Sequence, residues 1–380
     1  MLRFLPYIAK TLWRHRSRTL LTVSGSAVAL FVFCVIGAIH EGMHDLRTRQ
    51  EAEQSLIVFQ ANKFCPATSH LPQDYDEQIA RFDGVRDVVP IQVFTNNCRA
   101  SLDVVVFYGL PAAKLRAIRD FELTDGNWSE FERNQDAAVV GRAVAARRGI
   151  RVGDKFSIGD ISTVVAGIYS SGNPAEENYI YTHLDFLQRR RGADSVGTVT
   201  QHEVLLAEGI DAAAVAENID DQFRGGPVET DTRPKGVFQA KSLGDLAQLI
   251  ALSYYLGLAC VGLVLALVAT TTLMSVQDRV QEHAVLQTLG FSGPRVFALV
   301  LTESVVLGLA GGALGVGGAF VVLESTSLAI SAEAVSVAFQ ASWRLAGVAL
   351  LTALATGFLA GILPAWQAAR TEIVPALRNA

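Results

Sequence analysis

Four long apolar stretches constrain this chain more than any other feature. They cover residues 19–39, 246–277, 296–323 and 345–369, and only the third contains a charged residue, Glu303. A helix needs about 20 apolar residues to cross the hydrocarbon core of a bilayer, and each stretch is long enough. We therefore expect transmembrane helices at 19–40, 246–277, 296–323 and 345–369. Composition agrees, because charged residues make up 18% of the chain, below the roughly 25% usual for soluble domains.

The first apolar stretch has the basic leading segment of a secretory signal peptide. However, the apolar core of a signal peptide is only about 7–15 residues long and ends at a small-residue cleavage site. The stretch 19–39 is longer and lacks a clean site of that kind. A retained helix is therefore the expected interpretation.

Basic residues close to the apolar stretches predict how the chain is oriented, because short cytoplasmic segments are rich in Lys and Arg. Segment 1–18 contains several arginines and no acid, segment 278–295 contains Arg279 and Arg295, and the tail 370–380 contains Arg370 and Arg378. Residues 324–342 contain no Lys or Arg. We expect segments 1–18, 278–295 and 370–380 to be cytoplasmic. The domain 41–245 and the short loop 324–344 are then extracytoplasmic.

The extracytoplasmic domain has an excess of Asp and Glu and alternates short β-type runs with helical runs. The expected fold class is a membrane protein with four transmembrane α-helices and a large α+β extracytoplasmic domain inserted between helices 1 and 2. Strands are expected near 55–60, 85–94 and 203–206, and helices near 72–82 and 211–223. A β-rich lobe at about 121–200 separates two sequence-distant halves. Polar residues after helix 1 and the length of helix 2 predict a helical stalk that carries the domain.

Few residues of this domain suggest chemistry. His70, His183 and His202 lack metal-ligand spacing, and no hydrolase, zinc-protease or calcium-loop motif occurs, so neither a catalytic residue nor a metal site is expected. Glu176 and Glu177 are expected in a solvated loop. Cys65 and Cys98 pair as a disulfide if the domain faces an oxidising space, or else are two buried thiols. The acidic domain argues against nucleic-acid binding.

The segment 278–295 joins the second and third apolar stretches. A charged run is followed by the Gly-Phe-Ser-Gly-Pro break at 290–294. On a helical wheel, Val280 and Leu289 fall on opposite faces. This pattern predicts either a docking helix held between the bundle and a soluble partner, or one modestly buried amphipathic turn.

Two features of the third apolar stretch stand out. Glu303 is an intramembrane acid, and such residues are functional candidates by default. It acts either as part of a proton relay or as a hydrogen-bonded carboxyl that fixes helix packing. The glycines form small-xxx-small pairs, Gly308 with Gly312 and Gly311 with Gly315, which predict a close helix-packing face rather than general glycine tolerance.

Four motifs, in order, resemble those of the MacB/FtsX-type ABC transporter permeases, the mechanotransmitting class. They are LWRHRSRTLLTVSG at 12–25, AVVGRAVAARRGIRVGDKFSI followed by TVVAGIY at 138–169, VQDRVQEHAVLQTLGFSGPRVFALVLTESVVLGLAGGALGV at 276–316, and GILPAWQAARTEIVPALR at 361–378. The resemblance covers nearly the whole chain. It departs from the family at Glu282-His283-Ala284 and Gln287-Thr288-Leu289-Gly290, where the family usually has Glu-Ile-Gly and a basic residue before Ala-Leu-Gly.

The resemblance implies a permease subunit of a bacterial inner-membrane ABC transporter that moves its periplasmic domain to export or extract a substrate. No G-x-x-x-x-G-K-[ST] motif occurs, so we expect ATP and Mg to be bound by a separate ATPase dimer and this chain to hold no cofactor and to be no enzyme. Other expected partners are a second permease copy or a related permease, a periplasmic adaptor, and membrane lipid. The resemblance assigns coupling to the ATPase to Asp278, Arg279, Glu282, His283, Leu286, Gly290 and Arg295.

Two alternatives belong to other classes of protein. One is an FtsX-like signalling subunit that activates an extracytoplasmic hydrolase without transport. The other is a membrane-anchored binding protein with no ATPase.

Overall fold

The computed structural model describes residues 10–370 except 12, 53–54, 64–67, 97–103, 120, 243, 327–328, 333–334 and 340, and it describes only the backbone of 45–52, 239–242, 244–247, 249–250, 283 and 331–332. The chain divides into two compact units. The helical unit comprises Met1–His40, Ile250–Ser325 and Ala341–Ala380, and the inserted domain comprises Glu41–Leu249 and Thr326–Gln340.

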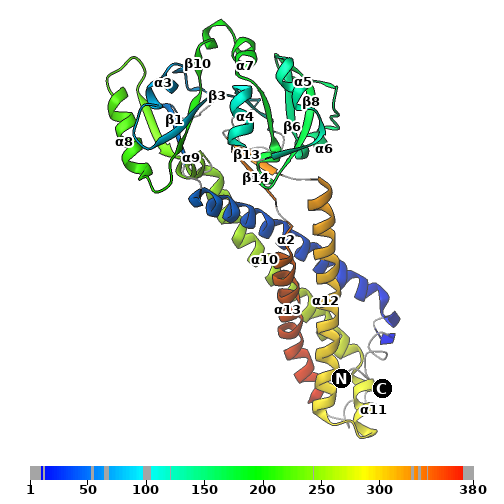
Figure 1. The fold of residues 1–380 in the computed structure, drawn as a ribbon. Helices are drawn as coiled ribbons and strands as arrows, with labels where there is room; N and C mark the ends of the chain where they lie inside the picture. Colours follow the sequence, from blue (N-terminus) through cyan, green and yellow to red (C-terminus); the bar gives the residue numbers. More distant parts are fainter. Residues whose placement is uncertain are drawn as a thin grey trace. The chain divides into compact units, whose positions relative to one another are not determined.

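Four long helices dominate the helical unit (Figure 1): α2 (Arg16–Ala52), α10 (Gly244–Asp278), α12 (Gly293–Thr326) and α13 (Trp343–Ala369). Among the described residues, these are the four that are long and apolar enough to cross a membrane. Helix α12 begins earlier than its apolar stretch because Pro294 suits a first helical turn, where a missing N–H costs nothing. The Ser342 hydroxyl accepts a hydrogen bond from the Leu345 N–H at 3.0 Å and so caps α13.

Small and branched apolar residues hold these helices together. One cluster joins α2, α10 and α13, a second joins α2, α12 and α13, and a third joins α10, α12 and α13. Alanines such as Ala353 and Ala365 are fully buried in these clusters. Close approach of small residues is how helices associate in lipid, where apolar burial alone gives no advantage.

A ten-stranded sheet forms the inserted domain, in the order β12-β1-β11-β3-β4-β9-β6-β8-β5, with β7 paired to β8. The strands are β1 (Ser55–Gln60), β3 (Val85–Thr95), β4 (Val106–Leu110), β5 (Phe121–Gly126), β6 (Ala137–Gly141), β7 (Lys155–Ile158), β8 (Ile161–Ser171), β9 (Tyr179–His183), β11 (Gln201–Leu206) and β12 (Thr230–Pro234). Strands β2 (Leu71–Pro72) and β10 (Thr198–Val199) form a separate pair. The two halves of the domain and the lobe between them therefore share one sheet.

Short helices cover this sheet. They are α3 (Tyr75–Ile79), α4 (Ala112–Ile118), α5 (Trp128–Arg133), α6 (Arg142–Arg148), α7 (Leu184–Arg191), α8 (Ala212–Phe223) and α9 (Lys235–Ser242), with 3-10 turns η3 (Glu176–Asn178) and η4 (Ala193–Ser195). The apolar face of α8 packs on β1 and β11. Strand β1 follows α2 in the chain, and β12 leads through α9 into α10. Because β1 and β12 are hydrogen-bonded neighbours, the chain enters and leaves this sheet through two adjacent strands.

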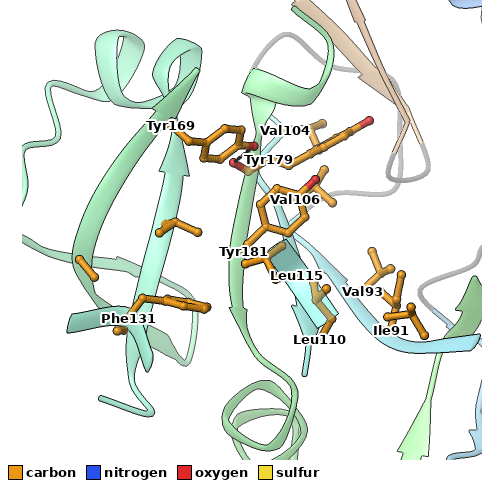
Figure 2. Close-up of a cluster of buried hydrophobic side chains, with 14 residues drawn as sticks. Ile91, Val93, Val104, Val106, Leu110, Leu115, Phe131, Tyr169, Tyr179 and Tyr181 are labelled. Carbon is orange, nitrogen blue, oxygen red and sulfur yellow. Dashed lines mark hydrogen bonds between the residues drawn. The ribbon is translucent and has the colours of Figure 1, made fainter. Parts of the chain in front are cut away.

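The core of the domain contains a group of aromatic side chains. Figure 2 shows Tyr169, Tyr179 and Tyr181 gathered beside the aliphatic residues of β3 and β4. The Tyr169 hydroxyl donates to the Tyr179 carbonyl at 3.1 Å. Phe121 stacks on both Tyr169 and Tyr181. This cluster joins β5, β8 and β9 into one packed layer.

The loop expected at 324–344 contains a β-hairpin that belongs to the inserted domain. Strand β13 (Ala329–Ala332) pairs with β14 (Val335–Ala338), and the Ser336 N–H donates to the Tyr179 hydroxyl at 3.1 Å. A Cβ on Gly42 of α2 would lie 2.2 Å from the Ala338 carbonyl oxygen, so glycine allows the close approach of α2 and β14. The short segment expected at 324–344 therefore contains two strands that were not predicted from the sequence.

Two smaller expectations in the inserted domain were wrong. Residues 72–82 do not form one helix, because Pro72 lies in β2 and only Tyr75–Ile79 is helical. Glu177 is buried rather than solvated, since its Oε1 accepts from the Ser170 hydroxyl at 2.7 Å and from Arg142 Nη2 at 3.1 Å. The fold class itself is confirmed: four apolar helices with a mixed α/β domain between the first and the second.

Candidate functional site

A short helix, α11 (Val280–Thr288), lies between α10 and α12. Arg279 has non-helical backbone angles and separates α10 from α11. Gly290 has a φ of +94°, a left-handed conformation that favours glycine, and it ends α11. The sequence therefore builds a helix–turn–helix–turn–helix at this end of the helical unit.

Arg279 is the buried centre of this end. Its Nη1 lies 3.2 Å from Glu303 Oε2 and its Nε lies 2.8 Å from Glu282 Oε2. The side chains of Arg279 and Glu303 are only 3% and 7% exposed. A buried charge is tolerated when it is paired and hydrogen-bonded. One guanidinium thus joins α11 to α12.

Hydroxyl groups complete the surroundings of Glu303. The Ser275 hydroxyl donates to Glu303 Oε1 at 3.4 Å, and the Ser304 hydroxyl donates to the Thr272 hydroxyl at 3.2 Å. All three hydroxyl residues are buried. The intramembrane acid therefore lies in a polar seam between α10 and α12.

The basic residues before and at the start of α2 pair with acids near α11. Arg18 Nη1 lies 2.8 Å from Asp278 Oδ2, and Arg14 Nη1 lies 3.7 Å from Glu282 Oε1. Exposed ion pairs contribute little stability, typically below about 1 kcal/mol, so these two mark which segments are neighbours rather than hold them together. Sequence reasoning did not identify Arg14 or Arg18 as site residues. The available signal was the opposite charge of the basic N-terminal segment and the acids at 278 and 282.

A groove of about 810 Å³ lies between the N-terminal segment and α11. Its lining residues are Lys10, Thr11, Trp13, Arg14, His15, Arg279, Gln281, Glu282, Val285 and Leu286. Trp13 is 79% exposed and Val285 46% exposed, and Leu289 at the end of α11 is 73% exposed. Large apolar side chains surrounded by charges are typical of a surface that binds another protein.

The structure does not bring every predicted coupling residue together. Arg279, Glu282 and Leu286 line the groove, and Asp278 binds Arg18. Gly290 forms an exposed turn and Arg295 is exposed at the start of α12, while the side chain of His283 lies outside the described residues. Cys65 and Cys98 also lie outside them, so their pairing stays a prediction. No cluster of potential metal ligands occurs among the described residues.

The four predicted packing glycines lie at helix contacts. A Cβ on Gly308 would lie 2.9 Å from the Ala353 carbonyl oxygen of α13, and one on Gly312 would lie 2.6 Å from the Ala353 Cβ. Added Cβ atoms on the other two would press on α2, at 2.5 Å from Ser26 Cβ for Gly311 and 2.5 Å from the Ala27 carbonyl oxygen for Gly315. Thus α12 packs with one glycine pair against α13 and the other against α2.

Comparison with known proteins covers both units. A family model described as the MacB-like periplasmic core domain matches residues 19–222. A second, described as the FtsX-like permease C-terminal, matches residues 254–373. Helix α11, the packing glycines and the α11 side of the groove lie in the second match.

Three curated relatives are similar over almost the whole chain. An uncharacterized ABC transporter permease of Methanocaldococcus jannaschii is 23% identical over 394 residues, which cover 99% of this chain and 97% of the relative. The pyoverdine export ATP-binding/permease protein PvdT of Pseudomonas fluorescens is 24% identical, with 97% of this chain and 58% of the relative covered. The macrolide export ATP-binding/permease protein MacB of Escherichia coli is 23% identical, with 97% and 59% covered.

The chain thus spans 58% and 59% of the two relatives whose names combine ATP-binding and permease functions, and nearly all of the relative named as a permease alone. Both family models, in this order, account for the inserted domain and for the helices that follow it. The chain is a multi-pass membrane protein and belongs to the MacB/FtsX-type family of ABC transporter permeases.

Proposed function

We propose that this chain is the permease subunit of an ABC transporter that couples ATP hydrolysis by a separate ATPase dimer to movement of the inserted domain. The movement drives export or extraction of a substrate, and ATP and Mg are bound by the ATPase subunits. The observation that carries the proposal is the groove between the N-terminal segment and α11. It combines exposed apolar side chains with charges, which suits a soluble partner rather than lipid.

Ion pairs support a mechanical role for this surface. A displacement of α11 passes to α12 through Arg279 and Glu303, and Arg18 with Asp278 connects α2 to the end of α10. Buried, paired charges resist separation because an uncompensated charge would remain. A partner that moves α11 therefore moves the membrane helices with it.

The orientation follows the distribution of basic residues. We place the N-terminal segment, the turn-and-helix segment 278–295 and the C-terminal tail in the cytoplasm, and the inserted domain in the periplasm or outside the cell. We further propose that the membrane is a bacterial inner membrane. A second permease copy, a related permease or a periplasmic adaptor completes the assembly, with lipid around the exposed helix faces. The relatives are named for unlike cargoes, pyoverdine and macrolide, so similarity of this degree assigns no cargo.

The test is a single charge placed in the groove, Val285→Asp. The tagged chain is purified in detergent from its native membranes, and co-purifying subunits with a Walker motif are identified together with their vanadate-sensitive ATP hydrolysis. We expect the variant to lose at least about tenfold of the bound ATPase, because a buried unpaired carboxylate is costly at an interface.

The matched control is Val196→Asp, which places the same charge on an exposed valine of the inserted domain. We expect that variant to retain the bound ATPase. Undiminished ATPase binding by Val285→Asp, at normal yield of the chain, would contradict the proposal.

A further inference from the structure

Three charged side chains meet inside the inserted domain. Glu203 of β11 binds Arg119, which directly follows α4, and Lys235, the first residue of α9. The three side chains are 2%, 9% and 13% exposed, in that order. Nothing in the proposed function above uses this triad.

The geometry makes Glu203 the shared partner. Arg119 donates to both carboxylate oxygens, with Nη1–Oε1 at 3.1 Å and Nη2–Oε2 at 2.5 Å, and Lys235 Nζ lies 3.1 Å from Oε1. Burial alone would raise the pKa of the Glu203 carboxyl, but the two cations together hold it well below its usual range. The two cations therefore favour the ionised form of the Glu203 carboxyl.

The two partners of Glu203 belong to segments that lead to different parts of the protein. Lys235 opens α9, and the chain continues from α9 into the membrane helix α10. Arg119 stands between α4 and β5, where the chain enters the β-rich lobe. One carboxylate on the central sheet therefore contacts the segment that leads to the membrane and the segment that leads to the lobe.

Helix α9 lies on the same face of the sheet as this carboxylate. Ile57 of β1 is directly opposite Glu203 in the register, so their side chains share a face. Phe238 of α9 packs against Ile57 and Phe59 in a small buried cluster, with its ring 5.1 Å from the Phe59 ring. Lys235 and Phe238 are thus two points, one ionic and one apolar, at which α9 contacts the sheet.

The other side of Arg119 faces the tyrosines. Arg119 is hydrogen-bonded to Tyr181, whose ring lies in the aromatic cluster with Tyr169 and Tyr179 (Figure 2). Tyr179 in turn accepts the hydrogen bond from Ser336 of the β13–β14 hairpin. Buried ion pairs, hydrogen bonds and ring contacts therefore lead from α9 through Glu203 to the hairpin between α12 and α13.

We propose that Glu203 is a positioning residue that fastens α9 to the central sheet, so that a displacement of α10 is delivered to the sheet and to the lobe beyond Arg119. The three charges are unequal in this role. Without Lys235, the ion pair of Glu203 and Arg119 remains, and its two charges cancel. Without Glu203, two buried cations remain without a partner. Lys235 is the contact that can be removed without unfolding the domain. The transmission of a displacement from α10 to the sheet rests on the proposed function. The attachment of α9 to the sheet through Lys235 and Glu203 does not.

The fastening is tested with Lys235→Met, which keeps a long unbranched side chain and removes the charge. Hydrogen exchange is measured on the full chain in detergent. We expect amides of α9 to exchange about tenfold faster or more, because a charge-assisted hydrogen bond is lost, while α8 and β11 exchange as before. Lys235→Arg, which restores the cation, should restore the slow exchange, and this rescue separates an ionic role from simple packing.

Arg224→Met is the matched control, because it removes a cation from an exposed pair with Asp221 and should leave α9 unchanged. Unchanged exchange of α9 in Lys235→Met would overturn the proposal. So would a uniform rise over the whole domain, which would mean that Lys235 only stabilises the fold.

The delivery of force is tested separately on the chain purified with its ATPase. Vanadate trapping with ATP should alter exchange in both α9 and β11 of the wild type, and in α9 alone in Lys235→Met. A change that still reaches β11 in the variant contradicts the role of Glu203. Absence of any bound ATPase contradicts the proposed function instead, and leaves the result on the isolated chain standing.

Discussion

Arg279 and Glu303 form a buried ion pair, with Nη1 and Oε2 3.2 Å apart, although 24 residues separate them in the chain. The pair gives an intramembrane carboxyl a fixed structural partner. It also explains why α11 does not need a large apolar face of its own, since an arginine at its start anchors it to α12.

Breaking this pair one residue at a time should be more harmful than removing both. Arg279→Met leaves the buried Glu303 carboxylate without its cation and should reduce the free energy of unfolding by about 3–5 kcal/mol. Glu303→Leu should cost less, because Arg279 keeps its pair with Glu282. The double variant should recover most of that loss. Thermal unfolding of the chain in detergent measures it, and losses that simply add in the double variant would contradict the coupling.

The glycine face of α12 should tolerate no side chain at its contact with α2. Gly315→Ala places a Cβ about 2.5 Å from the Ala27 carbonyl oxygen, and overpacking of this kind costs roughly 1–3 kcal/mol. Gly317→Ala is the control on the same helix, because nothing lies within 4 Å of its added Cβ. Thermal unfolding in detergent should show a lower stability for Gly315→Ala than for Gly317→Ala. Equal stabilities would contradict the prediction and mean that α2 can shift to make room for the added Cβ.

Stability of the inserted domain should fall in mild acid through His202. This residue is fully buried, its Nε2 lies 3.1 Å from the Pro72 carbonyl oxygen, and its Nδ1 has no partner among the described residues. Burial lowers its pKa to about 4, although the hydrogen bond to Pro72 opposes this. The unfolded chain, with a pKa near 6.5, therefore binds the proton first as pH falls.

This difference sets the sign of the effect. The stability due to neutral His202 is complete above pH ~6.5 and is lost as pH falls toward ~4, at no more than about 1.4 kcal/mol per pH unit. Unfolding midpoints at pH ~7.5 and ~5 measure it, and His202→Gln should flatten this difference while keeping a donor for Pro72. Below ~4.5 Glu203 adds a loss of the same sign, so the comparison stays above that value. An equal pH dependence in the variant would assign the effect to other groups.

Labelling of single cysteines should reveal the orientation of the chain. In a background with all four native cysteines replaced, Asp160→Cys in the exposed β7–β8 turn should react with a membrane-impermeant maleimide in intact spheroplasts. Leu289→Cys, which is as exposed but lies at the end of α11, should react only after permeabilisation. The reverse pattern would invert the proposed topology.

The sequence predicted the helices well because their physical requirement is local. A run of about 20 apolar residues has few alternatives to a membrane helix, so α2, α10, α12 and α13 could be located from composition alone. Strands β1, β3 and β11 of the inserted domain were also predicted, from their runs of apolar and β-branched residues. The small-xxx-small glycines were identifiable for the same reason, since their spacing alone places them on one helix face.

What the sequence did not predict depends on partners that are far apart in the chain. The β13–β14 hairpin consists mostly of Ala, Ser and Val, and it is stabilised by its contacts with Tyr179 rather than by local preference. Glu177 looked solvated because its partners, Arg142 and Ser170, come from other elements. The triad around Glu203 joins residues from three separate segments. Pairing of buried charges follows from the tertiary fold, which no local pattern encodes.

The contact between the β13–β14 hairpin and Tyr179 also fixes the order in which parts of the inserted domain can form during synthesis. Ser336 follows Tyr179 by 157 residues, and α10 and α12 lie between them in the chain. Chains emerge from the ribosome N-terminal end first, and domains generally fold as units during synthesis. The inserted domain can assemble its ten-stranded sheet as soon as β12 is made. It cannot acquire its last element until α10 and α12 have been synthesised, so the domain is completed only after these two helices and before α13.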